Sequence, residues 1–148
     1  MEVKQTKLIN YLCGMDESLG KEYKLCSKKV IDQLFVDGLR LSSFPFALTY
    51  AFTSLPTSKV PFQVVISAPK RNFKRAHDRN RIKRLTKECL RKNKHILESF
   101  LTSESNKNGQ LALFLVYRHN EELDYETLMK KMSKLLLTLR STIEQHEK

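Results

Sequence analysis

The chain has 148 residues, 41% of them hydrophobic, which is enough for one domain with a hydrophobic core of its own. Its 27 Lys and Arg residues exceed its 16 Asp and Glu residues, for a net charge of +11. No stretch approaches the ~20 apolar residues that cross a bilayer, and the N-terminal sequence lacks the apolar core of a secretory signal, so we exclude a membrane protein and expect a cytoplasmic one.

The first half of the chain predicts a tail, a helix and two strands. Residues 1–23 have no sustained periodicity and are expected to form a flexible tail. Ser27 then precedes an amphipathic helix that ends at Gly38. Period-two alternation over 44–53 and 60–68 predicts two strands, separated by a turn at Pro56, with large apolar side chains on one face and small ones on the other. We expect the large faces to form core and the small faces to floor a shallow groove.

The second half predicts a long basic helix, a buried strand and a final helix. Helical periodicity runs from residue 76 to 101, a polar loop follows, and residues 111–117 form an apolar strand. Asp124 caps the last helix, whose apolar stripe reaches Ile143. The order α-β-β(-β)-α-β-α, with a third early strand left open, predicts an α+β fold, a two-layer α–β sandwich in one domain over 24–145.

Almost the whole charge imbalance lies between residues 70 and 95, which hold 12 Lys and Arg residues but only two acidic ones, Asp78 and Glu88. Such concentration indicates a polyanionic partner rather than a merely solvated helix face. Along the helix, basic and polar side chains lie opposite the apolar stripe, at Asn80, Arg84, Lys87 and Arg91, with Lys83 and Lys94 beside them.

Residues that carry chemistry are sparse. The histidines at 77, 95, 119 and 146 have no metal-ligand spacing, no Gly-rich phosphate loop occurs, and Asp and Glu form no cluster. Cys13, Cys26 and Cys89 are an odd number at unequal spacing, which favours reduced thiols. From its residues alone, the chain is predicted to be a binding protein with no catalytic or metal site of its own.

The segment KRNFKRAHDRNRIKRLTKECLR resembles the signature of the bacterial ribonuclease P protein component, with its Arg-Asn-Arg motif at Arg79, Asn80 and Arg81. The similarity extends over about residues 24–140, through VIDQLFVDG, VVISAPKR and the last helix. It implies an α–β sandwich with a left-handed βαβ crossover, although general rules favour the right-handed form. It also implies the non-catalytic protein subunit of an RNA-based endoribonuclease, a hydrolase in tRNA processing whose catalytic RNA cuts the 5′ leader from precursor tRNA.

The resemblance assigns roles to particular residues. RNA-binding positions are Arg79, Asn80, Arg81, Lys83, Arg84 and Lys87, with Lys70, Arg71, Lys74 and Arg75 ahead of them; Arg91 is added because it continues the row. The leader cleft is expected at Ile31, Phe35, Ala47, Thr49 and Ser67. Ile31 and Thr49 stand where the family often has an aromatic residue, so the leader would be held more weakly or with another base preference.

The expected partners are the catalytic RNA and precursor tRNA, with no membrane and no DNA. Mg²⁺ is expected to be held mainly by the RNA, with none bound by the protein alone. A general RNA-binding or ribosomal protein of similar fold remains the alternative. A DNA-binding regulator is disfavoured because a strand, rather than a helix and a short turn, precedes the basic helix.

Overall fold

The computed structural model describes residues 20–53, 55, 60–101 and 110–146. Its elements, in chain order, are η1 (Lys21–Tyr23), α2 (Lys28–Asp37), β1 (Leu39–Ser43), β2 (Phe46–Phe52), β3 (Phe62–Ser67), α3 (Ala76–Asn93), α4 (His95–Leu101), β4 (Leu111–Tyr117) and α5 (Tyr125–His146). This order is an α+β fold, as predicted, and the early third strand that the sequence left open is present as β1. The predicted turn at Pro56 and the loop 102–109 lie outside the described residues.

One four-stranded sheet organises the molecule, in the order β1-β2-β4-β3. β2 pairs antiparallel with both β1 and β4, whereas β3 pairs parallel with β4. Because α3 and α4 connect the two parallel strands, they form the βαβ unit that the family resemblance implies. The left-handed sense of this crossover stays a prediction.

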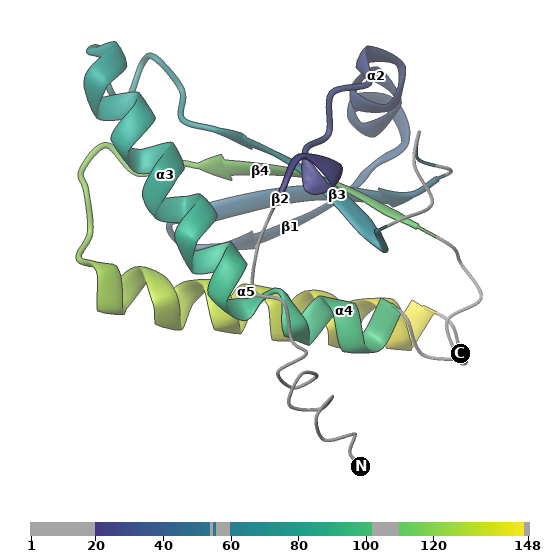
Figure 1. The fold of residues 1–148 in the computed structure, drawn as a ribbon. Helices are drawn as coiled ribbons and strands as arrows, with labels where there is room; N and C mark the ends of the chain where they lie inside the picture. The colour runs from purple at the N-terminus through teal and green to yellow at the C-terminus, as the bar shows by residue number, and fades with distance from the viewer. Residues whose placement is uncertain (1–19, 54, 56–59, 102–109, 147–148) are drawn as a thin grey trace.

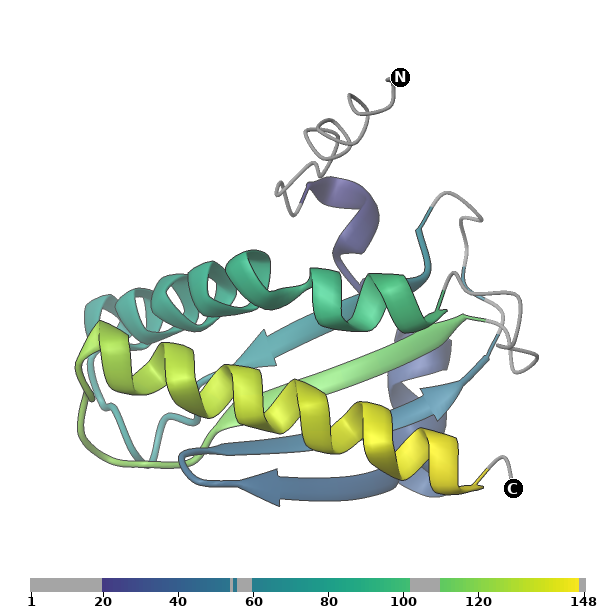
Figure 2. The same cartoon turned by 90° about the horizontal axis from the view of Figure 1, so that it is seen from below.

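The helices divide between the two faces of the sheet. α3, α4 and α5 cover one face, and α2 packs on the other (Figures 1 and 2). The covered face holds the main core, into which β2 and β4 send Phe46, Leu48, Tyr50, Leu113 and Tyr117. The predicted large face of β2 is therefore confirmed as core from Phe46 to Tyr50.

α2 forms because its apolar residues recur at helical spacing and its first turn is capped. The Ser27 hydroxyl accepts a hydrogen bond from the Val30 amide at 3.4 Å, and the helix ends at Gly38, as predicted. Val30 and Leu34 pack onto Ala112 of the sheet. A Cβ at Gly38 would lie only 2.3 Å from the Leu34 carbonyl oxygen and 2.6 Å from Thr49 Cγ2, so glycine lets α2 lie close to β2.

The strand predicted from residue 44 is wrong at its start. The chain instead makes a hairpin, with β1 ending at Ser43, a cis bond between Phe44 and Pro45, and β2 beginning at Phe46. Phe44 is 59% exposed and lies against the His119 ring, not in the core. Alternation alone cannot distinguish a strand residue from a turn residue that occupies the same position in the two-residue repeat.

The helix predicted over 76–101 is two helices. α3 ends at Asn93, whose side-chain amide donates to the Cys89 carbonyl, and α4 begins at His95. Lys94, between them, is only 3% exposed. The sequence predicted it beside the exposed cationic row, and this prediction is wrong. Its ammonium lies 3.7 Å from Glu98 Oε1 and 4.4 Å from the centre of the Tyr23 ring.

The described structure includes residues 20–23, the end of the segment expected to be a tail. Residues 20–25, which we call the N-terminal strap, run along the edge of the sheet at β3. The Leu25 amide donates to the Val64 carbonyl at 3.0 Å, and Gln63 Nε2 donates to the Glu22 carbonyl at 2.8 Å. The Tyr23 ring packs 5.2 Å from Phe62, and its hydroxyl bonds Glu98.

α5 begins as predicted. Asp124 accepts hydrogen bonds from the amide and hydroxyl of Thr127, and the apolar stripe of the helix lies in the main core. No helix within the described ranges is long and apolar enough to cross a membrane.

Candidate nucleic-acid interface

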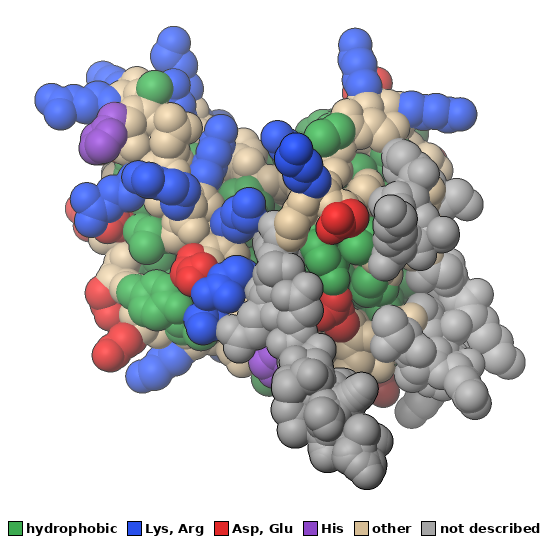
Figure 3. Space-filling view, viewed as in Figure 1, with side chains coloured by type: hydrophobic (Ala, Val, Ile, Leu, Met, Phe, Trp, Pro, Cys, Tyr) green, Lys and Arg blue, Asp and Glu red, His purple; other side chains and the backbone are tan. Residues whose placement is uncertain are grey.

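The basic helix presents one cationic side to solvent. Ile82, Cys89 and Leu90 are buried against the sheet and α5, and this fixes the rotation of α3. Asn80, Lys83, Arg84 and Lys87 consequently lie on the exposed side. Lys and Arg side chains gather over α3 in the space-filling view (Figure 3). Among the described residues, the side chains of Lys83, Arg84 and Lys87 make no hydrogen bond or ion pair, so their charges are available to a partner.

Three arginines predicted to bind RNA are already engaged within the chain. Arg79 donates to the carbonyls of Phe73 and Lys74, both at 2.9 Å, and so fastens the loop that leads into α3. Arg81 pairs with Glu122 at 3.0 Å, and Arg91 binds Glu88 through two contacts of 2.7 and 2.5 Å. These contacts leave the motif arginines less available than the lysines one turn further along.

The other predicted cations lie between β3 and α3. Lys70 and Arg71 occupy an exposed turn, held by hydrogen bonds from the amides of Asn72 and Phe73 to the Pro69 carbonyl. Lys74 and Arg75 are exposed just before the helix begins. Because the N-terminal end of a helix carries a partial positive charge, these side chains add to a field that favours an anion.

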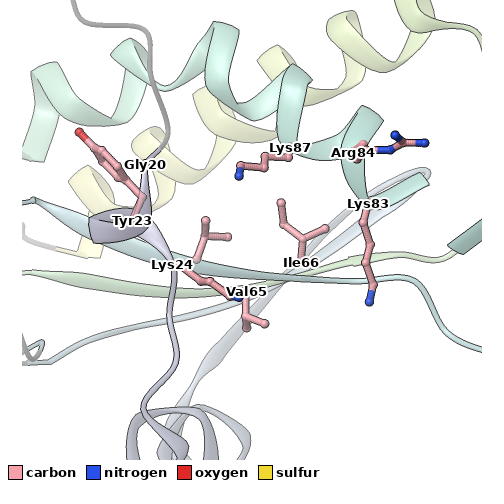
Figure 4. A pocket seen from close by; sticks show the side chains of 9 residues that line it. Gly20, Tyr23, Lys24, Val65, Ile66, Lys83, Arg84 and Lys87 are labelled. Atoms are coloured by element: carbon pink, nitrogen blue, oxygen red, sulfur yellow. The ribbon is translucent and has the colours of Figure 1, made fainter. Parts of the chain in front are cut away.

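A hollow of about 420 Å³ lies between the strap and α3 (Figure 4). We call it the strap groove. Its floor is β3, α3 supplies cations on one side, and the strap closes the other side. It is lined by Gly20, Tyr23, Lys24, Val64, Val65, Ile66, Lys83, Arg84 and Lys87. Lys24 had no role in the sequence-based prediction, because nothing in its neighbourhood of the sequence places it opposite α3.

The predicted leader-cleft residues share the face of the sheet that α2 covers. Strand register puts Thr49, Phe114 and Val65 in one row across the sheet, and Ala47, Val116 and Ser67 in the next. Ile31 and Phe35 come to this face from α2, where Ile31 packs against the sheet. Ser67 ends β3, just before the turn that carries Lys70 and Arg71. The five residues thus occupy one face, while their role in holding a leader stays a prediction.

Phe114 is a residue of this face that the sequence analysis missed. Its ring lies 4.9 Å from that of Phe35, edge to face, and the strand register places it directly beside Thr49. Phe35 itself is 56% exposed, so its ring is not buried in a core. Alternation within residues 111–117 could have revealed Phe114, since Leu111, Leu113 and Leu115 occupy the opposite face.

Groups suited to acid–base or metal chemistry do not converge. In the described part of the chain, no three His, Cys, Asp or Glu side chains lie together as a metal site needs. The hydrogen bond from Arg91 holds the pKa of Glu88 below its usual value, so this carboxylate stays ionised and is a poor proton donor. Asp124 is likewise held ionised, because hydrogen bonds from Thr127 lower its pKa.

Fold and surface together define a small α–β sandwich protein with one strongly cationic helix. The sequence profile of the family Ribonuclease P matches residues 19–140, so the chain belongs to this family. The ribonuclease P protein component of Porphyromonas gingivalis strain W83 is 30% identical over 127 residues, 84% of this chain and 88% of that protein. The protein of the same name from Chlorobaculum tepidum is 36% identical over 95 residues, 62% of this chain and 61% of that protein.

Solved structures support the same fold. The ribonuclease P protein of Staphylococcus aureus superposes with a TM-score of 0.60 at 16% identity, covering 79% of this chain and 94% of that one. The protein from Thermotoga maritima gives a TM-score of 0.58 at 19% identity and covers 76% and 94%. The family resemblance inferred from the sequence is thus confirmed by the sequence profile and the Porphyromonas gingivalis relative, and the fold by these structures.

Proposed function

We propose that this chain is the protein subunit of ribonuclease P, binding both the catalytic RNA and the 5′ leader of precursor tRNA in the cytoplasm. The observation that carries the proposal is the row of Lys83, Arg84 and Lys87 on α3, exposed and without partners among the described residues. Membership of the family supplies the class of RNA.

The cationic side of α3 would dock on folded RNA through its phosphates. Successive turns of an α-helix rise by about 5.4 Å, so residues 80, 84, 87 and 91 form a row that can follow a backbone strand. Each phosphate neutralised by a lysine or arginine releases counterions, and this release supplies most of the binding free energy. Arg79, Arg81 and Arg91 would contribute when RNA competes with their present partners.

The leader would lie on the face of the sheet covered by α2. Phe35 and Phe114 offer the aromatic surface on which unpaired bases stack, at about 1–3 kcal/mol for each base. Lys70 and Arg71, at the end of β3, would bind the phosphates that follow. Phe114 supplies an aromatic ring beside Thr49, where the family often has an aromatic residue, and so offsets part of the weaker grip expected there.

In this function the chain binds and positions RNA, and the cleavage falls to the RNA. We expect the RNA to hold the Mg²⁺, since the carboxylates and histidines of the described residues do not gather into a set of metal ligands. A protein held against the cleavage site contributes by fixing the substrate where reacting groups are already aligned.

Reconstitution tests the proposal directly. Purified chain would be mixed with the catalytic RNA of its own organism and precursor tRNA at a Mg²⁺ concentration too low for the RNA alone. We expect leader removal only when both are present and none with the chain alone. Cleavage by the chain alone would overturn the division of labour. Tight RNA binding without any rescue would favour the alternative, a general RNA-binding or ribosomal protein.

A further inference from the structure

The strap groove is lined by a different set of residues from those assigned to the leader. None of the predicted leader residues lines it, although Val65 shares a row of the sheet with Thr49 and Phe114. Val64, Val65 and Ile66 line it along the edge of the sheet at β3, to which the strap is bonded, and its walls are the strap and α3. Its volume of about 420 Å³ lies in the range of sites that enclose a small organic group, on the order of 300–1,000 Å³.

Cations reach this groove from both of its walls. Lys87 extends from α3 above β3 toward the strap, and Lys24 lies on the strap side next to Val65 (Figure 4). Lys83 descends from the same helix, whereas Arg84 points away from the floor (Figure 4). No side-chain partner for Lys24, Lys83 or Lys87 exists among residues 20–53, 55, 60–101 and 110–146. The side chains therefore offer positive charge around an apolar floor, which suits an anion with a flat apolar body.

The groove is also held in shape before any ligand arrives. Main-chain and side-chain hydrogen bonds fasten the strap to β3, and Tyr23 is fixed between Phe62 and the buried Lys94. A site that is already ordered loses little conformational entropy on binding. This distinguishes the strap groove from a set of surface lysines that merely share a helix.

We propose that the strap groove holds one unpaired nucleotide of the RNA that docks on α3. Its phosphate lies by Lys24 and Lys87, and its base packs on Ile66 beside Tyr23. This inference rests on the proposed function, because it takes RNA as the partner of α3. A paired nucleotide is excluded, since both faces of its base are stacked within the duplex and cannot reach the floor.

A titration of the full chain tests the inference, with isotope-labelled methyl groups of Val64 and Ile66 as reporters of the groove floor and of Ile31 as the reporter for α2. The probes are a uridine hexanucleotide, a blunt RNA duplex with the same number of phosphates, and free uridine monophosphate. We expect the hexanucleotide to shift the floor signals saturably, and the duplex to leave them in place.

Charge variants complete the test. The double variant Lys24→Gln/Lys87→Gln should weaken hexanucleotide binding at the floor at least fivefold and reduce the log–log salt slope by about 1.4, or ~0.7 for each lost contact to a single strand. The control Lys130→Gln/Lys134→Gln, which removes two exposed lysines of α5, should match the unmodified chain.

Three results would overturn the inference. In the first, the hexanucleotide shifts the methyl signals of Ile31 but not those of Val64 and Ile66. In the second, the duplex shifts the signals of Val64 and Ile66 as much as the hexanucleotide does, which would indicate general electrostatic attraction. The third is uridine monophosphate saturating the floor at the hexanucleotide's concentration, which would indicate a pocket for free nucleotides. Each can occur while reconstituted cleavage persists, so failure here is distinct from failure of the proposed function.

Discussion

At the scale of single residues, the basic side chains of this protein are not equivalent. Arg79 holds the loop before α3, and Arg91 and Glu88 hold each other through two short contacts. Lys83, Arg84 and Lys87 have no such partner in the described ranges. The sequence predicted a uniform row because it reveals the spacing of charges along a helix, but the partner of Arg81 comes from the distant loop before α5.

Glu122 should therefore compete with RNA for Arg81. Their 3.0 Å contact is partly exposed, with 58% of the arginine and 35% of the glutamate side chain accessible, and such pairs contribute about 0.2–1 kcal/mol. Glu122→Gln should tighten binding to the catalytic RNA by about 1.5- to 5-fold, measured at fixed salt.

The neighbouring Glu121 provides the control. Its carboxylate lies 4.0 Å from His119 and has no contact with Arg81 among the described residues, so Glu121→Gln removes the same charge without freeing the arginine. An equal gain in both variants would attribute the effect to net charge alone. In the background Arg81→Ala, the advantage of Glu122→Gln should disappear.

Gly38 is the residue on which the position of α2 depends. An added Cβ would overlap the Leu34 carbonyl and the Thr49 methyl, and crowding of this kind costs about 1–3 kcal/mol. Gly38→Ala should lower the free energy of unfolding in urea by that amount. Gly20→Ala is the matched control, since its closest contact, at 3.2 Å, is the movable end of the Glu22 side chain. Equal losses for the two variants would contradict this account.

At the scale of elements, periodicity predicted most helices and strands, and it failed where side chains from elsewhere intervene. The caps at Ser27 and Asp124 are local features and were found. The break at Lys94 was not, because the groups that surround this buried lysine include Tyr23, which is 71 residues away in the chain. The docking of the strap was missed for the same reason, since main-chain bonds to β3 leave no periodic mark in the sequence.

Cys89 lies on the buried side of α3, and its burial predicts that its thiol reacts slowly. Burial raises the pKa of Cys89 to about 11, whereas Cys26 is exposed. Because the thiolate is the reactive form, alkylation at pH 8 should modify Cys26 within minutes and leave Cys89 intact until the protein unfolds. Site-resolved mass spectrometry checks this, with urea-unfolded chain as the control.

The same pKa shift sets a direction for stability. The folded state keeps the Cys89 proton to a higher pH than the unfolded chain, whose thiol has the ordinary value of 9.0, so this group makes the free energy of unfolding fall as pH rises from about 9 to 11. Cys89→Ala should reduce that part of the decline. In the alkylation experiment, rapid labelling of Cys89 in the native protein would contradict its burial and show that the buried side of α3 opens to solvent.

At the scale of the whole molecule, the sheet separates two surfaces. One face is buried under α3, α4 and α5; the other, carrying Thr49, Phe114 and Ser67, is covered in part by α2. The edge of the sheet at β3 joins them, with the strap groove on one side and the Lys70–Arg71 turn at its end. The sequence predicted which residues share the α2 face, but strand order was needed to place Phe114 between β2 and β3.

The central claim is that the exposed cations of α3 dock the protein on folded RNA, and the salt dependence of binding to the catalytic RNA tests it most directly. Neutralising about six phosphates predicts a log–log slope of roughly −4 to −5. Lys83→Gln/Lys87→Gln should make that slope shallower by about 2, while Lys130→Gln/Lys134→Gln, with the same net charge, should leave it unchanged. A slope near zero, or equal changes in the two double variants, would contradict the account.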